Sequence, residues 1–239
     1  MTCELFVVPL NEGTERPAEK LASLVLQASE LHELSVLKGR RRNQYLLSRF
    51  YLKVILSGLY GVAEPSRMSL LRQDGLPPLL DPPADLYFSI SHSRDVVLLA
   101  VSRSASIAVD VEWHRGRDFL EFSNTYFHPR VFTEINVLDG NDLEAVFYQY
   151  WVRLEAGLKL AKGSVFSDFM SRCCPQNVLE DPEGPLFNSY AGQYREYSIA
   201  LASEANMIPR LYLLDCSERC FNFLPLDVDL SKKVFLVEA

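Results

Sequence analysis

The sequence predicts a fold of the α+β class, built as a pseudo-symmetric tandem of two similar α/β halves. Helix-like segments precede strand-like segments twice along the 239 residues. The apolar stretch VVLLAVS at 96–102 is also echoed by YSIALAS at 197–203. We therefore expect two compact units, residues 1–114 and 115–239, each with its own sheet. Two such halves leave a cleft between them, which is a usual place for a ligand.

The composition favours a soluble globular protein over a membrane protein or a general nucleic-acid binder. With 48% hydrophobic and 23% charged residues, the chain has the composition of an ordinary soluble domain. No apolar run approaches the ~20 residues that span a bilayer, and the first apolar stretch is too short for a signal peptide. We expect a cytoplasmic protein without a membrane partner. The net charge of −7 argues against a general nucleic-acid binder but leaves room for a local basic pocket.

The elements of the first half follow from local patterns. Residues 3–9 (CELFVVP) are apolar and β-branched, which predicts an opening strand. Apolar residues at helical spacing predict one helix over 16–37 and a second over 41–57. Residues 72–85 are dense in proline and contain Asp-Gly, so we expect turns there.

Three strands are expected next, over 86–93 (LYFSISHS), 95–102 (DVVLLAVS) and 106–113 (SIAVDVEW). Short polar turns join them, which predicts an antiparallel sheet of sequential neighbours.

The second half begins with a predicted helix over 142–162. Its apolar residues recur at helical spacing: Phe147, Tyr150, Trp151, Leu154 and Leu158. Residues 175–195 are predicted to be mostly loop, and the stretches 196–203 and 210–216 to be strands.

The strand IAVDVEW carries two carboxylates on one face. Side chains alternate along a strand, so Asp110 and Glu112 point one way while Val109 and Val111 point the other. Neighbouring like charges repel, which is ordinary on a solvated edge. The alternative is that a cation lies between them, and paired carboxylates with open positions suit Mg²⁺. Glu155 on a facing helix is the candidate third carboxylate.

The helix segment WVRLEAGLK places an aromatic ring, a carboxylate and an ammonium at steps of four. Trp151, Glu155 and Lys159 therefore share one helix face. The ordinary interpretation is a solvated ion pair that contributes little.

The segment FSISHSRD places Ser89, Ser91 and Ser93 on one strand face. His92 lies at the strand-to-turn corner. It is either a turn histidine with a capping role or a phosphate ligand together with Ser91.

A basic stripe is expected on the helix over 41–57, where Arg42, Arg49 and Lys53 share one face. Such stripes are often solvated. Arginine forks also match phosphate oxygens, so the stripe is a candidate phosphate-binding surface.

Taken together and in this order, the four segments resemble the Sfp-like 4′-phosphopantetheinyl transferases. AVDVE at 108–112 is similar to the family's acidic strand, and WVRLEAGLK at 151–159 to its signature helix. FSISHS at 88–93 and DGLP at 74–77 are similar to two upstream motifs. The resemblance covers residues 40 to 165 best.

The resemblance implies a monomer that binds coenzyme A in the cleft between two α+β halves. It implies transfer of the phosphopantetheine arm to a serine of an apo acyl or peptidyl carrier protein, with release of adenosine 3′,5′-bisphosphate. It further implies Mg²⁺ on the three carboxylates Asp110, Glu112 and Glu155. Glu155 is then the expected general base and Lys159 the group that neutralises the leaving phosphate. The nucleotide end is expected to be held by Arg42, Arg49, Ser91 and His92.

The chain departs from the family pattern at three positions. Ala108 replaces a glycine, and Leu76 and Leu154 replace lysines expected near the pyrophosphate. These losses motivate an alternative, a weak or inactive relative that binds coenzyme A or a carrier protein without transfer. The sequence does not identify the carrier protein, nor whether it serves fatty acid, polyketide or nonribosomal peptide biosynthesis.

Overall fold

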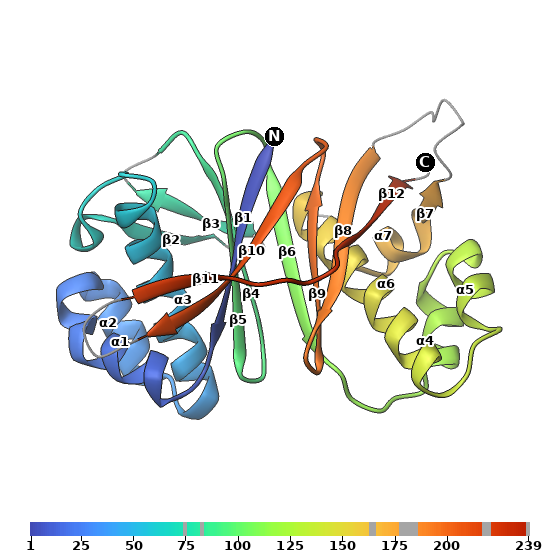
Figure 1. The fold of residues 1–239 in the computed structure, drawn as a ribbon, viewed down its shortest axis with the longest axis horizontal. Helices are drawn as coiled ribbons and strands as arrows, with labels where there is room; N and C mark the ends of the chain where they lie inside the picture. Colours follow the sequence, from blue (N-terminus) through green and yellow to red (C-terminus); the bar gives the residue numbers. More distant parts are fainter. Residues whose placement is uncertain (74–75, 82–83, 163–165, 177–185, 217–220, 238–239) are drawn as a thin grey trace.

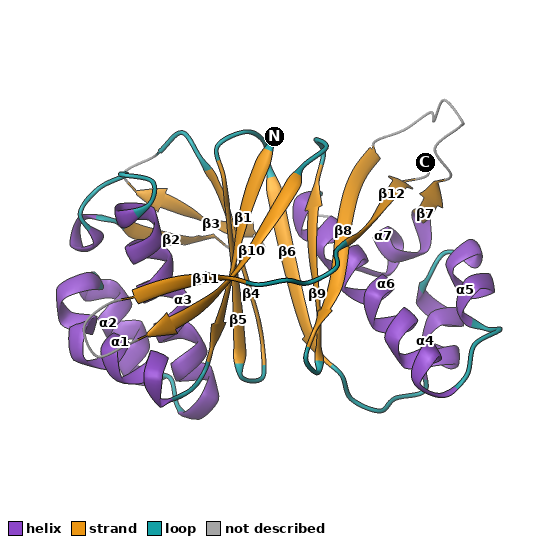
Figure 2. Cartoon of the chain, in the orientation of Figure 1, coloured by secondary structure: helices purple, strands orange, loops and turns teal. Residues whose placement is uncertain are grey.

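Two five-stranded sheets lie at the centre of the molecule, with helices at both ends (Figure 1, Figure 2). The structure is a computed structural model that describes residues 1–73, 76–81, 84–162, 166–176, 186–216 and 221–237. The predicted mixed α+β class is confirmed.

The first sheet has the strand order β11-β10-β1-β5-β4. Its strands are β1 (Thr2–Pro9), β4 (Tyr87–Ser93), β5 (Val96–Ser102), β10 (Ile208–Cys216) and β11 (Phe221–Pro225). Strand β1 runs antiparallel to β5 and parallel to β10. Three helices lie on its outer side: α1 (Glu12–Val25), α2 (Ala28–Val36) and α3 (Gly39–Gly58). Strands from near both ends of the chain therefore meet in one sheet.

The second sheet has the order β6-β9-β8-β12-β7. Its strands are β6 (Ile107–Trp113), β7 (Cys173–Gln176), β8 (Leu186–Tyr194), β9 (Tyr197–Ser203) and β12 (Ser231–Val237). The helices beside it are α4 (Phe119–Tyr126), α5 (Pro129–Ile135), α6 (Gly140–Leu160) and α7 (Phe166–Arg172). A short 3-10 helix (Pro65–Arg67) and a two-stranded hairpin of β2 (Ser69–Gln73) and β3 (Leu76–Asp81) lie beside the first half.

The sheets are apolar on both faces because each lies between two layers. In β1, Leu5 and Val7 are buried in the core between the two sheets. Phe6 and Val8 are buried in the core beneath α1–α3. A third core lies between the second sheet and α4–α7. This alternation explains why β1 is apolar at nearly every position rather than at every second one.

Two predicted elements are corrected. The single helix expected over 16–37 is two helices, because Leu26 is extended and Gln27 starts α2 with a backbone N–H that donates to Glu30. Strand β6 was expected beside β5, but it pairs with β9 in the other sheet. Helical and strand periodicity describe one segment at a time, so they do not tell which neighbour a strand joins.

Other segments were missed. The stretch 72–85 contributes to both strands of the β2–β3 hairpin, and the expected loop over 175–195 includes the whole of β8. Helices α4, α5 and α7 and strands β11 and β12 were not predicted. The strands β1, β4, β5, β9 and β10 and the helices α3 and α6 are confirmed. In the described part of the chain, no helix is both long enough and apolar enough to cross a bilayer.

Candidate functional site

The site is built where the edge strands of the two sheets, β4 and β6, meet. Three serines of β4, which we call the serine ladder, bridge the two edges (Ser89, Ser91 and Ser93). Their Oγ atoms accept hydrogen bonds from the backbone N–H groups of Val109, Val111 and Trp113, over 3.0, 3.4 and 3.0 Å. The ladder thus supplies acceptors that a neighbouring strand would otherwise supply.

The carboxylates of β6 lie along this seam. Val109 and Val111 are buried between the sheets, and Asp110 and Glu112 take the alternate positions, so the predicted alternation is confirmed. Asp110 is only 4% exposed, and its Oδ1 accepts from Ser91 Oγ at 2.9 Å. Glu112 Oε2 accepts from Ser93 Oγ at 3.0 Å. Both carboxylates are therefore held by hydroxyls of the opposite sheet.

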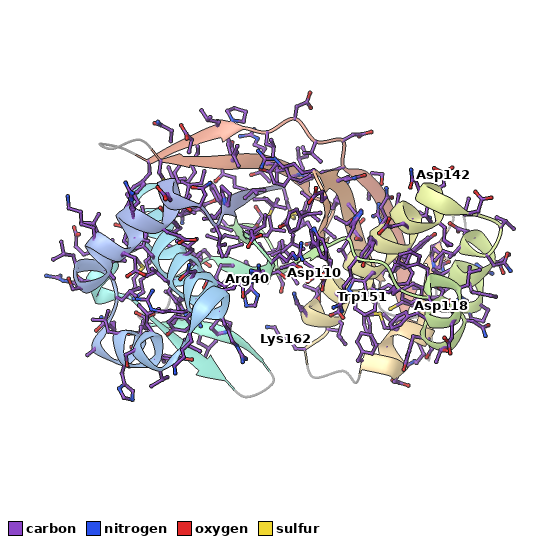
Figure 3. The ribbon with its side chains drawn as sticks, turned by 90° about the horizontal axis from the view of Figure 1, so that it is seen from below. Arg40, Asp110, Asp118, Asp142, Trp151 and Lys162 are labelled. Atoms are coloured by element: carbon purple, nitrogen blue, oxygen red, sulfur yellow. The ribbon has the colours of Figure 1, made fainter. Side chains whose placement is uncertain are left out.

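Helix α6 brings the third carboxylate and a cation to β6. Buried apolar residues fix its inner face, and Trp151 contacts the rings of Phe122, Phe147 and Phe166. Lys159 lies two turns further along. Its ammonium donates to Asp110 Oδ1 at 2.7 Å, to Ser91 Oγ at 3.1 Å and to the Val109 carbonyl at 3.2 Å. Figure 3 shows Asp110 in the middle of the molecule, between Arg40 at the start of α3 and Trp151 on α6.

The charge of Asp110 acts on the pKa of the other two carboxylates, Glu112 and Glu155. Burial raises the pKa of Glu155 to about 7, and the charges of Asp110 and Glu112 add to this rise while Lys159 opposes it. Burial and the charge of Asp110 also raise the pKa of Glu112. Such mutual repulsion means that three acidic groups lie within electrostatic reach of each other.

The residues fit a divalent cation by charge, although they do not form a finished ligand set. The buried Oδ2 of Asp110 has no hydrogen-bond partner among the described residues. A cation between the three carboxylates would relieve their repulsion and give that oxygen a partner. In the same part of the chain, no three acidic, histidine or cysteine side chains are gathered closely enough to hold a metal as they stand. Binding would therefore need at least one of the three side chains to change its rotamer.

His92 lies at the end of β4, on the surface, next to the turn into β5. Partial desolvation lowers its pKa, and the positive charges of Lys159 and Arg41 lower it further. The arginine whose charge reaches His92 is thus Arg41, which was not among the predicted site residues. Gln44 of the same helix donates to the Arg94 carbonyl at 2.9 Å, which fixes α3 against this corner.

The predicted basic stripe is not a single surface. Arg42 forms an ion pair with Glu19 of α1 through both arms of its guanidinium group. Arg49 stacks over the Tyr45 ring, 5.1 Å from its centroid, and its buried Nε has no partner in the described residues. Lys53 is fully buried and paired with Glu30. The stripe interpretation is therefore wrong for Lys53.

The departures from the family pattern have a structural basis on α6. Leu154 is 0% exposed and lies in the core between the second sheet and its helices. The neighbouring Arg153 is also buried and donates to the carbonyls of Ser189 and Ser231. It therefore does not replace the missing lysine.

Residues 74–75 of the DGLP segment lie outside the described residues, as does Cys220.

One further cation was missed by the sequence reasoning. The guanidinium of Arg117 lies among four aromatic rings, 5.1 Å from the centroid of Trp151 and 5.4–5.7 Å from those of Phe122, Phe147 and Tyr148. Its positive charge acts on Glu112 and opposes the rise in that residue's pKa. A lone arginine in a turn carries no sequence signal, because only folding brings the rings around it.

Comparison with known proteins finds similar proteins that share one name. The chain is 33% identical over 122 residues to the 4′-phosphopantetheinyl transferase HetI of Nostoc sp., covering 49% of this chain and 51% of that protein. It is 24% identical over 140 residues to a putative 4′-phosphopantetheinyl transferase of Synechocystis sp. (58% and 56% covered). It is 28% identical over 130 residues to the 4′-phosphopantetheinyl transferase AcpT of Salmonella typhimurium (54% and 64% covered).

The matches span between about half and just under two thirds of the length of these relatives. No protein-family model matches the chain. The relatives nevertheless carry the same name as the family that the four motifs indicated. The resemblance is thereby confirmed: the chain is similar, over about half of its length, to proteins named 4′-phosphopantetheinyl transferase.

Proposed function

We propose that this protein transfers the 4′-phosphopantetheine arm of coenzyme A to a serine of an apo acyl or peptidyl carrier protein. The observation that carries the proposal is the meeting of β6 and α6. Two carboxylates, Asp110 and Glu112, come from the strand, while Glu155 and Lys159 come from the helix. The electrostatic coupling of Glu155 to both strand carboxylates and to Lys159 supports one shared site.

The reaction is a phosphoryl transfer. The carrier serine Oγ attacks the β-phosphorus of coenzyme A, and a new P–O bond forms. The bond from that phosphorus to the bridging oxygen breaks, and adenosine 3′,5′-bisphosphate leaves with the bonding electron pair. Such reactions are catalysed mostly by positioning and by neutralising charge.

Glu155 is the proposed general base and Lys159 the proposed cation at the leaving group. A carboxylate placed against the carrier serine can accept the hydroxyl proton as the new P–O bond forms. The Lys159 ammonium already lies against Asp110. It would turn to the leaving phosphate and neutralise it or donate a proton.

Asp110, Glu112 and Glu155 are the proposed ligands of Mg²⁺. When bound, the ion neutralises charge on the pyrophosphate oxygens. The unpartnered Oδ2 of Asp110 supports this assignment.

The nucleotide end is proposed to lie against β4 and α3. His92, Ser91 and Arg49 remain candidates for its phosphates, and Arg41 joins them because its charge reaches His92. Arg42 would first have to leave Glu19. The Ser91 hydroxyl donates to Asp110 in this structure, so a phosphate contact would require that hydroxyl to turn.

We further propose that the halves 1–114 and 115–239 are pseudo-repeats that bind coenzyme A between them. Two central sheets, each with its own helices, support two such units, although strands cross between the halves: β10 and β11 lie in the first sheet and β6 in the second. A cytoplasmic monomer without a nucleic-acid or membrane partner remains part of the proposal.

Intact mass of an apo carrier protein, after incubation with this protein, coenzyme A and Mg²⁺, tests the function. The expected result is a gain of one phosphopantetheine, which Glu155→Gln should prevent. A panel of apo carriers from the same host covers the unknown substrate. If the mass is unchanged for every carrier while coenzyme A still binds, the alternative holds and the protein is a binding relative.

A further inference from the structure

The three hydroxyls of the serine ladder differ in the group to which each donates its proton. Ser93 donates to Glu112 at 3.0 Å and Ser91 donates to Asp110 at 2.9 Å. Ser89 accepts the Val109 N–H in the same way but touches no carboxylate in the described part of the chain. One strand therefore carries both a structural serine and serines that bind acidic groups.

We propose that Ser93 is a positioning residue, which holds the Glu112 carboxylate ready for the divalent cation. This inference rests on the proposed function, because it assumes that Glu112 serves a cation. It concerns a residue that none of the motif-based assignments gives a role.

The direction of the Ser93 hydroxyl is set by the backbone. A serine hydroxyl has one proton to donate and lone pairs to accept. The Trp113 N–H donates to Ser93 Oγ at 3.0 Å, which leaves the hydroxyl proton to point to Glu112. A free glutamate samples many rotamers, so a fixed donor lowers the entropy lost when the carboxylate takes a ligand.

Two further contacts fix the end of β4, where Ser93 meets Glu112. The Arg94 guanidinium stacks on the Trp113 ring, 3.3 Å from its centroid. Arg40 of α3 pairs with Asp95 at 3.0 Å, which ties the same β4–β5 turn to the first half. The distance between Ser93 and Glu112 therefore depends on how β4 and β6 are held together.

Ser93→Ala and Ser89→Ala form a matched pair for the test. Each removes one ladder acceptor of a β6 amide, but only Ser93→Ala removes a donor to a carboxylate. Mn²⁺ binding to the full chain, measured by calorimetry without coenzyme A or carrier, is the readout. We expect about tenfold weaker binding for Ser93→Ala, as for other groups that orient metal ligands. We expect unchanged binding for Ser89→Ala and for the hydroxyl-keeping Ser93→Thr.

The double variant Ser93→Ala/Glu112→Gln completes the cycle. If Ser93 acts through Glu112, then Ser93→Ala should weaken Mn²⁺ binding no further in the Glu112→Gln background. Equal Mn²⁺ affinity of Ser93→Ala and the parent would overturn the positioning role while leaving the proposed function standing. If the parent chain itself binds no Mn²⁺, the metal assignment falls together with this inference. Thermal melts of each variant show whether a loss of Mn²⁺ binding comes from unfolding. Equal losses of Mn²⁺ affinity in Ser93→Ala and Ser89→Ala would also overturn the inference.

Discussion

The ammonium of Lys159 lies 2.7 Å from Asp110 Oδ1, although the spacing along α6 pairs Lys159 with Glu155. The ordinary helix pairing is thus replaced by one that joins α6 to β6. A lysine four residues after a glutamate on a solvated helix gains only ~0.5 kcal/mol from that neighbour. Removing the cation beside a buried carboxylate costs more, because Asp110 has little access to water and its charge would be left unpaired.

Lys159→Met should destabilise the protein when divalent cations are removed. The methionine keeps the alkyl stem but leaves the Asp110 carboxylate buried without a cation. The expected loss is about 1–3 kcal/mol, less than for a fully buried pair because the Lys159 side chain is 34% exposed. Urea unfolding in the presence of a chelator measures it, and millimolar Mg²⁺ should return part of the loss.

The second member of this cycle is Asp110→Asn. In the Lys159→Met background, Asp110→Asn should restore stability, because no unpaired charge is then buried. Repulsion between Asp110 and Glu112 alone would give the opposite order, with Asp110 variants more stable than the parent chain. Equal unfolding midpoints for Lys159→Met and the parent in chelator would show that the contact contributes nothing.

Glu155 should make the metal-free protein less stable as the pH rises. Its pKa is raised from an ordinary 4.5 to about 7 on folding, so between these values the folded state holds a proton that the unfolded state has lost. The stabilisation is complete below pH 4.5 and is lost as the pH rises through 7. Compared with Glu155→Gln, the parent should lose at most about 3 kcal/mol across this range. Chemical unfolding of both proteins from pH 5 to 8 measures the difference, and parallel curves would contradict it.

Much of the fold could be predicted because the spacing of apolar residues within each segment indicates whether it is a helix or a strand. The alternation in 107–113 correctly put Val109 and Asp110 on opposite faces of the strand. The apolar positions of α6 correctly placed Leu154 among the packing residues. These patterns depend on which face of one element is buried, and that information is local.

The remaining features depend on contacts distant in sequence. Strand β6 joins β9 rather than its sequential neighbour, because pairing is decided by the assembled sheet. The bridge from Ser93 to Glu112 spans the two sheets, so the sequence indicated only that the three alternate serines share a strand face. Lys53 looked like part of a basic surface, since its buried partner Glu30 comes from a different helix.

Arg41 and Arg42 give a matched pair for the nucleotide end of coenzyme A. Arg41 acts on His92, whereas Arg42 is bound to Glu19. Arg41→Gln should raise KM for coenzyme A several-fold with little change in kcat, because contacts to a remote phosphate act equally in ground and transition states. Arg42→Gln should leave KM unchanged and cost less than about 1 kcal/mol of stability.

Steady-state kinetics with coenzyme A and with dephospho-coenzyme A distinguish the contacts. The Arg41→Gln and His92→Ala defects should shrink when the 3′-phosphate is absent. A rise in KM for Arg42→Gln alone would instead show that this arginine leaves Glu19 to bind the cofactor.

Leu154→Lys restores the residue type of the family pattern but should damage this protein. Leu154 is 0% exposed among apolar neighbours, so a lysine would bury its ammonium without a partner. Burial of an unpaired charge costs several kcal/mol. A loss of about 3 kcal/mol lowers the melting temperature by roughly 6–12 °C in a chain of this size.

Leu158→Lys is the control, four residues further along α6 and only partly buried. It should change the melting temperature much less, because its ammonium can reach water. Thermal melts of both variants, followed by calorimetric titration with coenzyme A, make the comparison. Tighter coenzyme A binding by Leu154→Lys with an unchanged melt would mean that position 154 faces the ligand. A lower melt for Leu154→Lys alone would mean that α6 packs this position into the core. A second cation beside Lys159 would then come from another residue, and Arg117, whose charge acts on Glu112, is one candidate.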